Sequence, residues 1–199
     1  FYEKFGKYRV SADAAGSNDA SHIATIRKPS KDAVVDKAFV MAASYWNVAI
    51  PNGAVAIDGK PITWVEAVTN DIPSYADWFH SVRADVTSLV KAKIDAAPVG
   101  SVSFTFTEGN LKSSIDGEII VVVFHVPSVT VAHTVSLLFG GQQLQGDRFE
   151  LTLAKPFDKN KTGAVADMGL GISYSYQGGV QYSTVDVNGV RLSTAAGGQ

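Results

Sequence analysis

Short segments in which apolar and polar residues alternate recur along the chain, each bounded by glycine, proline, asparagine or aspartate. In the segment 100–109 (GSVSFTFTEG), Val102, Phe104 and Phe106 fall on one face of an extended backbone, because successive side chains point to opposite faces. About a dozen such segments follow one another, which is the spacing typical of sandwiches and jelly rolls. The sequence therefore predicts an all-β fold, an antiparallel β-sandwich that is jelly-roll-like and has at most one or two short helices.

Hairpin signals and one continuous apolar run refine this prediction. Asp58-Gly59 and Asn188-Gly189 each stand between alternating segments, and such pairs favour two-residue hairpin turns. The run 118–127 (EIIVVVFHVP) is apolar without alternation, so we expect a central strand that is buried on both faces. The segments 148–156 and 169–177 also alternate and are predicted to be strands.

A helix is predicted in the segment 82–97 (VRADVTSLVKAKIDAA). Either Asp85 or Thr87 could serve as its N-cap, and Leu89, Val90 and Ile94 follow at roughly helical spacing. A short helical turn followed by coil up to Pro98 is the alternative. No convincing repeat or linker divides the chain, so one domain is expected over residues 1–199.

Composition excludes several classes of protein. The chain has 17 Lys and Arg against 19 Asp and Glu without a run of one sign, which argues against nucleic acid as a partner. It has no cysteine, so disulfides, thiolate metal sites and cysteine catalysis are excluded. The longest apolar run is far below the roughly 20 residues of a membrane-spanning helix, and no membrane insertion is expected.

A ligand-binding surface could lie in the aromatic stretch 74–80 (SYADWFH). Tyr75, Trp78, Phe79 and His80 occur within six positions, after a string of turn-forming residues. Aromatic faces of this kind stack on sugar rings or on other apolar ligands. The competing interpretation, which we favour, is that two of these rings point inward and close one end of the sandwich.

Metal sites have weaker signals. Carboxylates in the turns, among them Asp13, Asp58 and Asp116, leave a structural calcium ion as an open alternative, although no EF-hand loop is present. The four histidines are His22, His80, His125 and His133, of which His125 and His133 could approach one another across a hairpin. Zinc would still need a third ligand and no zinc-binding spacing is present, so metal catalysis is not expected.

Signals for an enzyme are also weak. The chain has no G-x-S-x-G elbow and no glycine-rich phosphate loop. Paired carboxylates for glycoside hydrolysis would come from Glu66, Glu108, Glu118 or Glu150. We expect each of these four glutamates at the surface and the protein not to be an enzyme.

Four segments in order carry a resemblance: 54–64 (AVAIDGKPITW), 83–90 (RADVTSLV), 102–109 (VSFTFTEG) and 117–127 (GEIIVVVFHVP). Together they resemble the galactose-binding-like jelly-roll modules of carbohydrate-binding and accessory domains. They are also similar to β-sandwich modules of large secreted bacterial surface proteins, of the adhesin or surface-layer type. The resemblance extends from about Val34 onward. It implies a module without catalytic residues that binds sugar through aromatic and polar loop residues, often beside a structural calcium ion.

These observations lead to an expected function. We expect a non-catalytic module of a bacterial surface protein, secreted or at the cell surface, that acts in adhesion or in surface or filament assembly. Its partner would be a glycan or another protein subunit, and a carbohydrate-binding module or a self-assembling filament or matrix subunit are the alternatives. Because the chain ends in STAAGGQ after a hairpin signal, it is expected to be a segment of a longer chain or a subunit whose edge a second copy completes, giving a homo-oligomer.

Overall fold

The computed structural model describes residues 1–16, 19–70, 78–141, 143, 146–153, 156, 158, 160–173, 183–194 and 196. Backbone packing divides the chain into two compact units, Phe1–Ala166 and Asp167–Gln199. The single domain expected over residues 1–199 stays a prediction. No described helix is long and apolar enough to cross a membrane.

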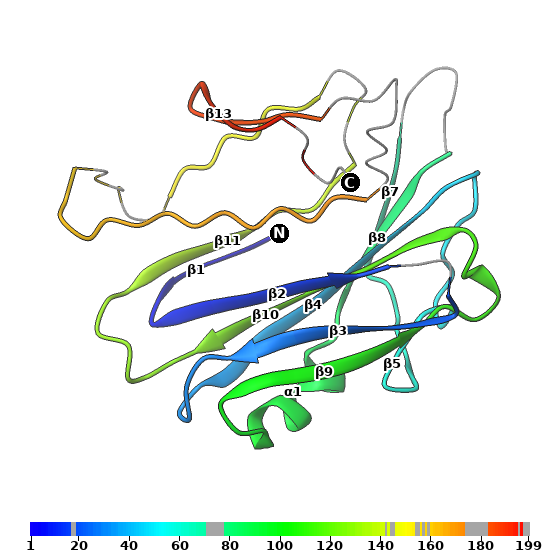
Figure 1. Cartoon of the computed structure of the whole chain (residues 1–199), viewed down its shortest axis with the longest axis horizontal. Coiled ribbons are helices and arrows are strands. Elements are labelled where there is room, and N and C mark those ends of the chain that lie inside the picture. The colour runs from blue at the N-terminus through cyan, green and yellow to red at the C-terminus, as the bar shows by residue number, and fades with distance from the viewer. Residues whose placement is uncertain are drawn as a thin grey trace. The chain divides into compact units, whose positions relative to one another are not determined.

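The all-β class is confirmed, with a first unit built from three antiparallel sheets (Figure 1). The largest sheet contains, in order, β2 (Tyr8–Ala15), β10 (Ile115–His125), β4 (Val34–Ser44), β8 (His80–Asp85) and β7 (Glu66–Thr69). The second contains β3 (Ser21–Lys28), β9 (Gly100–Thr107), β5 (Ala56–Ile57) and β6 (Lys60–Pro61). The third is a ribbon of β1 (Tyr2–Gly6) and β11 (His133–Leu137).

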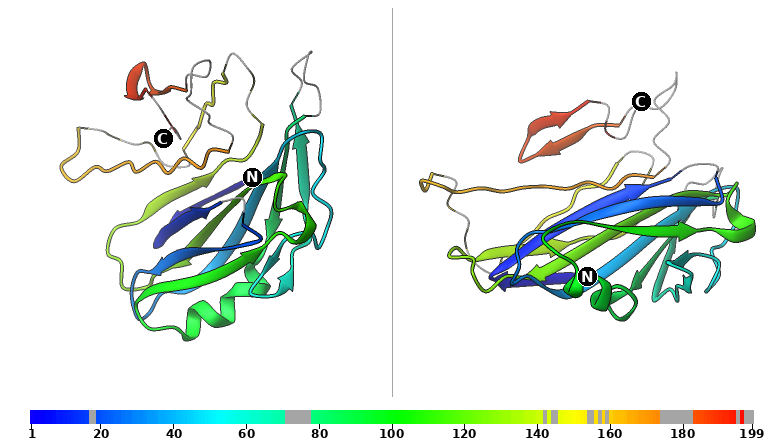
Figure 2. Two further views of the ribbon diagram at one scale, coloured as in Figure 1. Left: turned by 45° about the vertical axis from the view of Figure 1, so that its right-hand side comes forward. Right: turned by 60° about the horizontal axis from the view of Figure 1, so that its bottom comes forward.

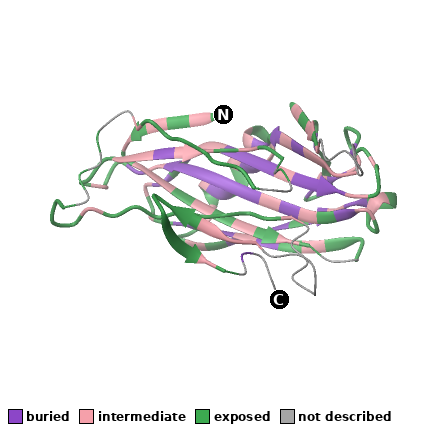
Figure 3. Ribbon diagram, turned by 90° about the horizontal axis from the view of Figure 1, so that it is seen from above, coloured by how far each residue is buried: buried purple, intermediate pink, exposed green. Residues whose placement is uncertain are grey.

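The core of the first unit lies between the two larger sheets. Residues on the inner face of β10, such as Ile120 and Phe124, share one buried cluster with Phe104 and Phe106 of β9. Figure 3 shows that the buried residues lie along strands, where they are interrupted by partly buried and exposed positions. Burial of side chains of this size contributes roughly 1.5–3 kcal/mol each, so this apolar layer is the main stabilising element.

The edges of the two larger sheets are joined through side chains. Edge strand β3 has backbone N–H groups that β9 does not use. The Thr25 N–H donates to Oδ2 of Asp13 at 2.6 Å, and the Arg27 N–H donates to Oγ of Ser11 at 2.8 Å. Because Asp13 and Ser11 belong to β2, these bonds close the sandwich along one edge and satisfy an otherwise open strand.

The central position predicted for the continuous apolar run is confirmed, since β10 lies between β2 and β4 and residues 120–124 are all buried.

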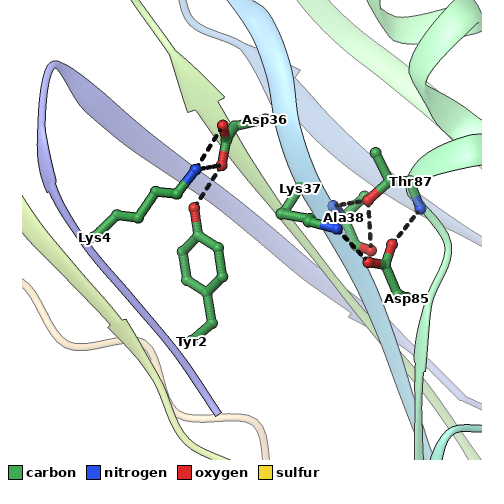
Figure 4. Close-up of polar contacts among 7 residues, drawn as sticks. All are labelled: Tyr2, Lys4, Asp36, Lys37, Ala38, Asp85 and Thr87. Atoms are coloured by element: carbon green, nitrogen blue, oxygen red, sulfur yellow. Dashed lines mark hydrogen bonds and ion pairs between the residues drawn. The ribbon is translucent and has the colours of Figure 1, made fainter.

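Part of the outer face of the large sheet is covered by the start of the chain. The rings of Phe1 and Tyr2 pack edge-on against Phe39 of β4 at 5.1 and 5.6 Å. Tyr2 and Lys4 also bind the carboxylate of Asp36, as Figure 4 shows.

The predicted helix is present as α1 (Thr87–Ala96), beside the sandwich in Figures 1 and 2. Its N-cap is Val86 rather than Asp85 or Thr87, because the Val86 N–H is held by the Ala38 carbonyl at 2.9 Å. Asp85 accepts instead from the N–H of Thr87, whose hydroxyl oxygen accepts from the Ala38 N–H (Figure 4). Both predicted caps therefore tie the helix start to β4 and β8.

Both predicted hairpins are confirmed. Asp58 and Gly59 join β5 to β6 with φ angles of 48° and 74°. In the second unit, Asn188 and Gly189 join β12 (Val185–Val187) to β13 (Val190–Ser193) with φ angles of 50° and 78°. The left-handed backbone at both central positions is the conformation that Asx-Gly pairs favour.

Two of the predicted strands are not formed over the part of their length that the structure describes. Residues 148–153 and 169–173 lie outside strands, and the rest of the segment 169–177 falls outside the described residues. Phe149 is 63% exposed and Leu151 is 52% exposed, so these apolar side chains of the segment 148–156 are not packed in a core. Alternation alone does not form a strand, because a strand also needs a neighbour to accept its backbone hydrogen bonds.

Candidate functional site

The predicted aromatic stretch lies at the start of β8. Tyr75 falls outside the described residues, and Trp78, Phe79 and His80 are each partly buried. The Phe79 N–H donates to Oδ1 of Asn70 at 2.9 Å, which ties the stretch to the end of β7. The expected closing of the sandwich end by these rings stays a prediction.

A second pair of aromatic residues lies beside Trp78. The sequence pattern does not connect this pair to the predicted stretch. Tyr45 and Trp46 directly follow β4, and the pairing of Ser44 with His80 brings the end of β4 to the start of β8. The ring centroids of Trp46 and Trp78 lie 5.0 Å apart, and those of Tyr45 and Trp46 lie 5.4 Å apart. We call Tyr45, Trp46 and Trp78 the aromatic surface, because Trp46 is 61% exposed.

The backbone of the aromatic surface is unusual. Trp46 and Asn47 have φ angles of 60° and 56°, and a positive φ is an outlier for a bulky residue such as tryptophan. The Asn47 N–H donates to the Trp78 carbonyl at 3.0 Å, and the Tyr45 N–H donates to the Ser114 carbonyl at 3.0 Å. These bonds hold the turn from both sides, and backbone strain of this kind is concentrated at functional sites.

A group of three polar residues replaces apolar side chains at one end of the core. His22 lies on β3 in the same inward phase as Ala24 and Ile26, and Glu118 lies on β10 in the inward phase of Ile120. Glu108 continues the inward phase of Phe106, immediately beyond β9. β3 and β10 begin and β9 ends at the right-hand end of the sandwich in Figure 1, and ligand atoms from the three side chains lie within 4.8 Å of one another. We call these three residues the His–Glu–Glu cluster.

The geometry of the cluster is compact and enclosed. Nε2 of His22 forms a direct hydrogen bond with Oε2 of Glu118 and lies 3.8 Å from Oε1 of Glu108. The side chains of both glutamates have no exposed surface, and that of His22 is 8% exposed. Within the described part of the chain, both oxygens of Glu108, Oε1 of Glu118 and Nδ1 of His22 have no hydrogen-bond partner.

Burial shifts the protonation of all three groups. It raises the pKa of Glu108 to about 7, and the negative charge of Asp116 adds to this rise. It raises the pKa of Glu118 to about 9, with a further contribution from Glu108, and it lowers the pKa of His22. Burial thus favours the uncharged form of each of the three groups.

The surface location expected for the four glutamates is wrong for two of them. Glu66 and Glu150 do pair with arginines at the surface, with Arg83 and Arg148 respectively. Glu108 and Glu118 are fully buried, because Glu108 continues the inward phase of β9 and Glu118 has the inward phase of Ile120 on β10. For Glu108 this phase could be read in the sequence, since the residue lies two positions after Phe106 in the alternation of Val102, Phe104 and Phe106. Glu118 begins a continuous apolar run, in which no phase can be read.

The cluster is also where the described residues could hold a metal ion. In the His–Glu–Glu cluster, one ligand atom from each of the three residues lies within 4.8 Å of the other two. Among the described histidines and carboxylates, this is the group of three that is compact enough for a metal ion. Two carboxylates considered for calcium bind the protein itself. Asp13 lies on β2 rather than in a turn and accepts from the Thr25 N–H, and Asp58 pairs with Lys93.

Comparison of the chain with protein-family models, with curated proteins and with solved structures found no match. The sandwich-like all-β architecture, which is compatible with a jelly roll, is therefore established by the structure itself. The aromatic surface and the His–Glu–Glu cluster are two candidate functional sites among the described residues.

Proposed function

We propose that the chain is a non-catalytic module of a bacterial surface protein that acts in adhesion by binding glycans through Tyr45, Trp46 and Trp78. One observation carries the proposal. Trp46 is 61% exposed on a backbone with a φ of 60°, and its ring is packed against that of Trp78. An exposed tryptophan held in a strained conformation serves binding better than it serves packing.

Glycan is the ligand class that best suits this surface. The C–H faces of a sugar ring pack on indole and phenol rings, while its hydroxyl groups need polar partners nearby. Asn47 and His80 provide such groups beside Trp46, where Oδ1 of Asn47 and Nε2 of His80 lie 3.4 Å apart. The resemblance to galactose-binding-like modules of adhesin-type proteins supports the same ligand class and an extracellular location.

The absence of catalysis is part of the proposal. Glu108 and Glu118, two carboxylates whose pKa values are raised by burial, are enclosed and present no surface on which a polysaccharide could lie. A pair of glycosidase carboxylates must flank the scissile bond. The enclosed geometry therefore supports a binding module rather than a hydrolase.

Screening of the purified chain and its Trp46→Ala variant on a glycan array tests the proposal. We expect the wild type to bind a subset of the glycans and the variant to lose at least ten-fold in affinity for them, with an unchanged melting temperature. Phe149→Ala is the matched control, because Phe149 is equally exposed but lies away from strands. This control variant should bind like the wild type.

Two outcomes would contradict the proposal. Glycan binding that survives both Trp46→Ala and Trp78→Ala would remove the aromatic surface from recognition. A wild type that binds no glycan and grows into polymers with rising concentration, measured by light scattering, would favour the filament or matrix subunit instead.

A further inference from the structure

Several buried polar atoms of the His–Glu–Glu cluster have no hydrogen-bond partner in the described part of the molecule. Three carboxylate oxygens, both from Glu108 and one from Glu118, are buried without a hydrogen-bond partner. Among the described residues, His22 is the only basic side chain within 4 Å of either carboxylate. Buried polar groups are normally paired, because leaving one unpaired costs free energy that folding must offset.

We propose that His22, Glu108 and Glu118 form a closed structural site for a divalent transition metal ion, Zn²⁺ being the ion tested, that joins the two larger sheets. His22 on β3 and Glu108 beyond β9 come from the four-stranded sheet, and Glu118 comes from the five-stranded sheet. An ion held by all three would thus connect the sheets at the end of the sandwich where β3 and β10 begin (Figure 1).

The donor atoms select the class of metal. Calcium and magnesium prefer shells made of oxygen atoms only, whereas an imidazole nitrogen with carboxylate oxygens suits zinc and similar ions. Nε2 of His22 and one oxygen from each glutamate provide three donors, and the second oxygen of Glu108 would complete a distorted four-coordinate shell, because a bidentate carboxylate spans less than a tetrahedral angle. Two carboxylates also balance the charge of a divalent cation next to a neutral imidazole.

The spacing of the donors fits such an ion after a small contraction. Nε2 of His22 and Oε1 of Glu108 lie 3.8 Å apart, and one ligand atom from each residue lies within 4.8 Å of the others. Tetrahedral zinc places its nitrogen and oxygen donors roughly 3.3 Å from one another, given metal–ligand distances of about 2.0–2.2 Å. Rotation of the two glutamate side chains would suffice, and it would separate Nε2 of His22 from Oε2 of Glu118.

The surroundings favour a cation over an anion. Asp19 acts electrostatically on His22, and Asp116 acts on Glu108, so the exposed residues near the cluster add negative potential. The segment between the two glutamates also supports the aromatic surface, since the Tyr45 hydroxyl donates to the Ser113 carbonyl at 2.8 Å. A bound metal would hold both ends of this segment.

The test uses the full chain, stripped of metal with a chelator and then titrated with ZnCl₂, MnCl₂ or CaCl₂ in a calorimeter. We expect one Zn²⁺ per chain, and a rise in melting temperature of about 5–10 °C when free Zn²⁺ is a hundred-fold above Kd. Glu108→Gln and Glu118→Gln keep the shape of the side chain and should weaken zinc binding at least ten-fold. The exposed Glu150→Gln variant is the matched control and should bind zinc like the wild type.

Spectroscopy provides a readout that does not depend on stability. Co²⁺ in place of Zn²⁺ should give the visible absorption bands of a four-coordinate site, and these bands should be lost in His22→Gln.

Zinc binding that is equal in the wild type and the three cluster variants would overturn the proposal. So would the absence of stoichiometric zinc binding, or a preference for Ca²⁺. Because no glycan enters these measurements, they can fail while glycan binding succeeds, and the reverse.

Discussion

Replacement of Glu108 by methionine should stabilise the metal-free protein. The side chain of Glu108 is fully enclosed, and neither of its oxygens has a hydrogen-bond partner among the described residues. Leaving a buried polar group unsatisfied costs about 1–3 kcal/mol. Methionine has a similar length and no such group, so Glu108→Met should raise the free energy of unfolding by about 1–3 kcal/mol in chelator.

Zinc should reverse this order of stability. At a free zinc concentration a thousand-fold above Kd, a single site adds about 4.1 kcal/mol to the wild type. The variant lacks one ligand and should gain little, so the wild type becomes the more stable protein. The free energy of unfolding by urea, measured with chelator and with zinc, gives both comparisons at constant protein concentration.

A control variant and two outcomes make the test decisive. Glu150→Met replaces a glutamate whose side chain is 76% exposed, so it should change stability by less than about 0.5 kcal/mol in either condition. If Glu108→Met destabilises the metal-free protein by more than about 1 kcal/mol, the argument from unpartnered oxygens is refuted. The same order of stability with and without zinc would refute the metal site.

Three further predictions concern the scaffold. Phe104→Ala removes a ring that is 1% exposed and should cost about 3–5 kcal/mol of stability in urea unfolding. Thr87→Val deprives the Ala38 N–H of its acceptor and should cost about 1–3 kcal/mol in the same assay, whereas an unchanged midpoint would show that this bond is not needed. Hydrogen bonds from the Ser30 hydroxyl and the Ser128 N–H lower the pKa of Asp32 to about 2, so the stability they give is complete above about pH 4 and is lost as the pH falls towards 2. Melting temperatures of the wild type and Asp32→Asn should therefore differ at pH 6 and converge near pH 2.

Local features of the sequence were sufficient for most of the scaffold. The alternation of Val102, Phe104 and Phe106 matches the inward face of β9, and the continuous run 118–127 matches the buried central strand β10. Asx-Gly pairs formed hairpins at Asp58 and Asn188, because a left-handed turn depends on its own two residues. The predicted helix likewise formed over Thr87–Ala96.

Features that depend on distant partners were missed. The segment 148–156 alternates but does not form a strand over its described residues 148–153, since alternation cannot supply the neighbouring strand that its backbone would need. Trp46 and Trp78 meet because β4 pairs with β8, although 31 residues separate them in the sequence. The register of pairing between two strands is a tertiary property, which the period of a single strand does not reveal.

The His–Glu–Glu cluster shows where the division lies. The sequence by itself contains an alternation whose apolar phase His22 and Glu108 continue, since this phase follows from the two-residue period of a strand, whereas Glu118 begins a continuous apolar run that has no readable phase. Only the tertiary structure decided that the three residues meet, because β3 pairs with β9 so that His22 lies opposite Phe106, and β10 lies in the facing sheet. The period of side-chain direction belongs to a single strand, whereas the meeting of these three side chains depends on how β3, β9 and β10 are placed relative to one another.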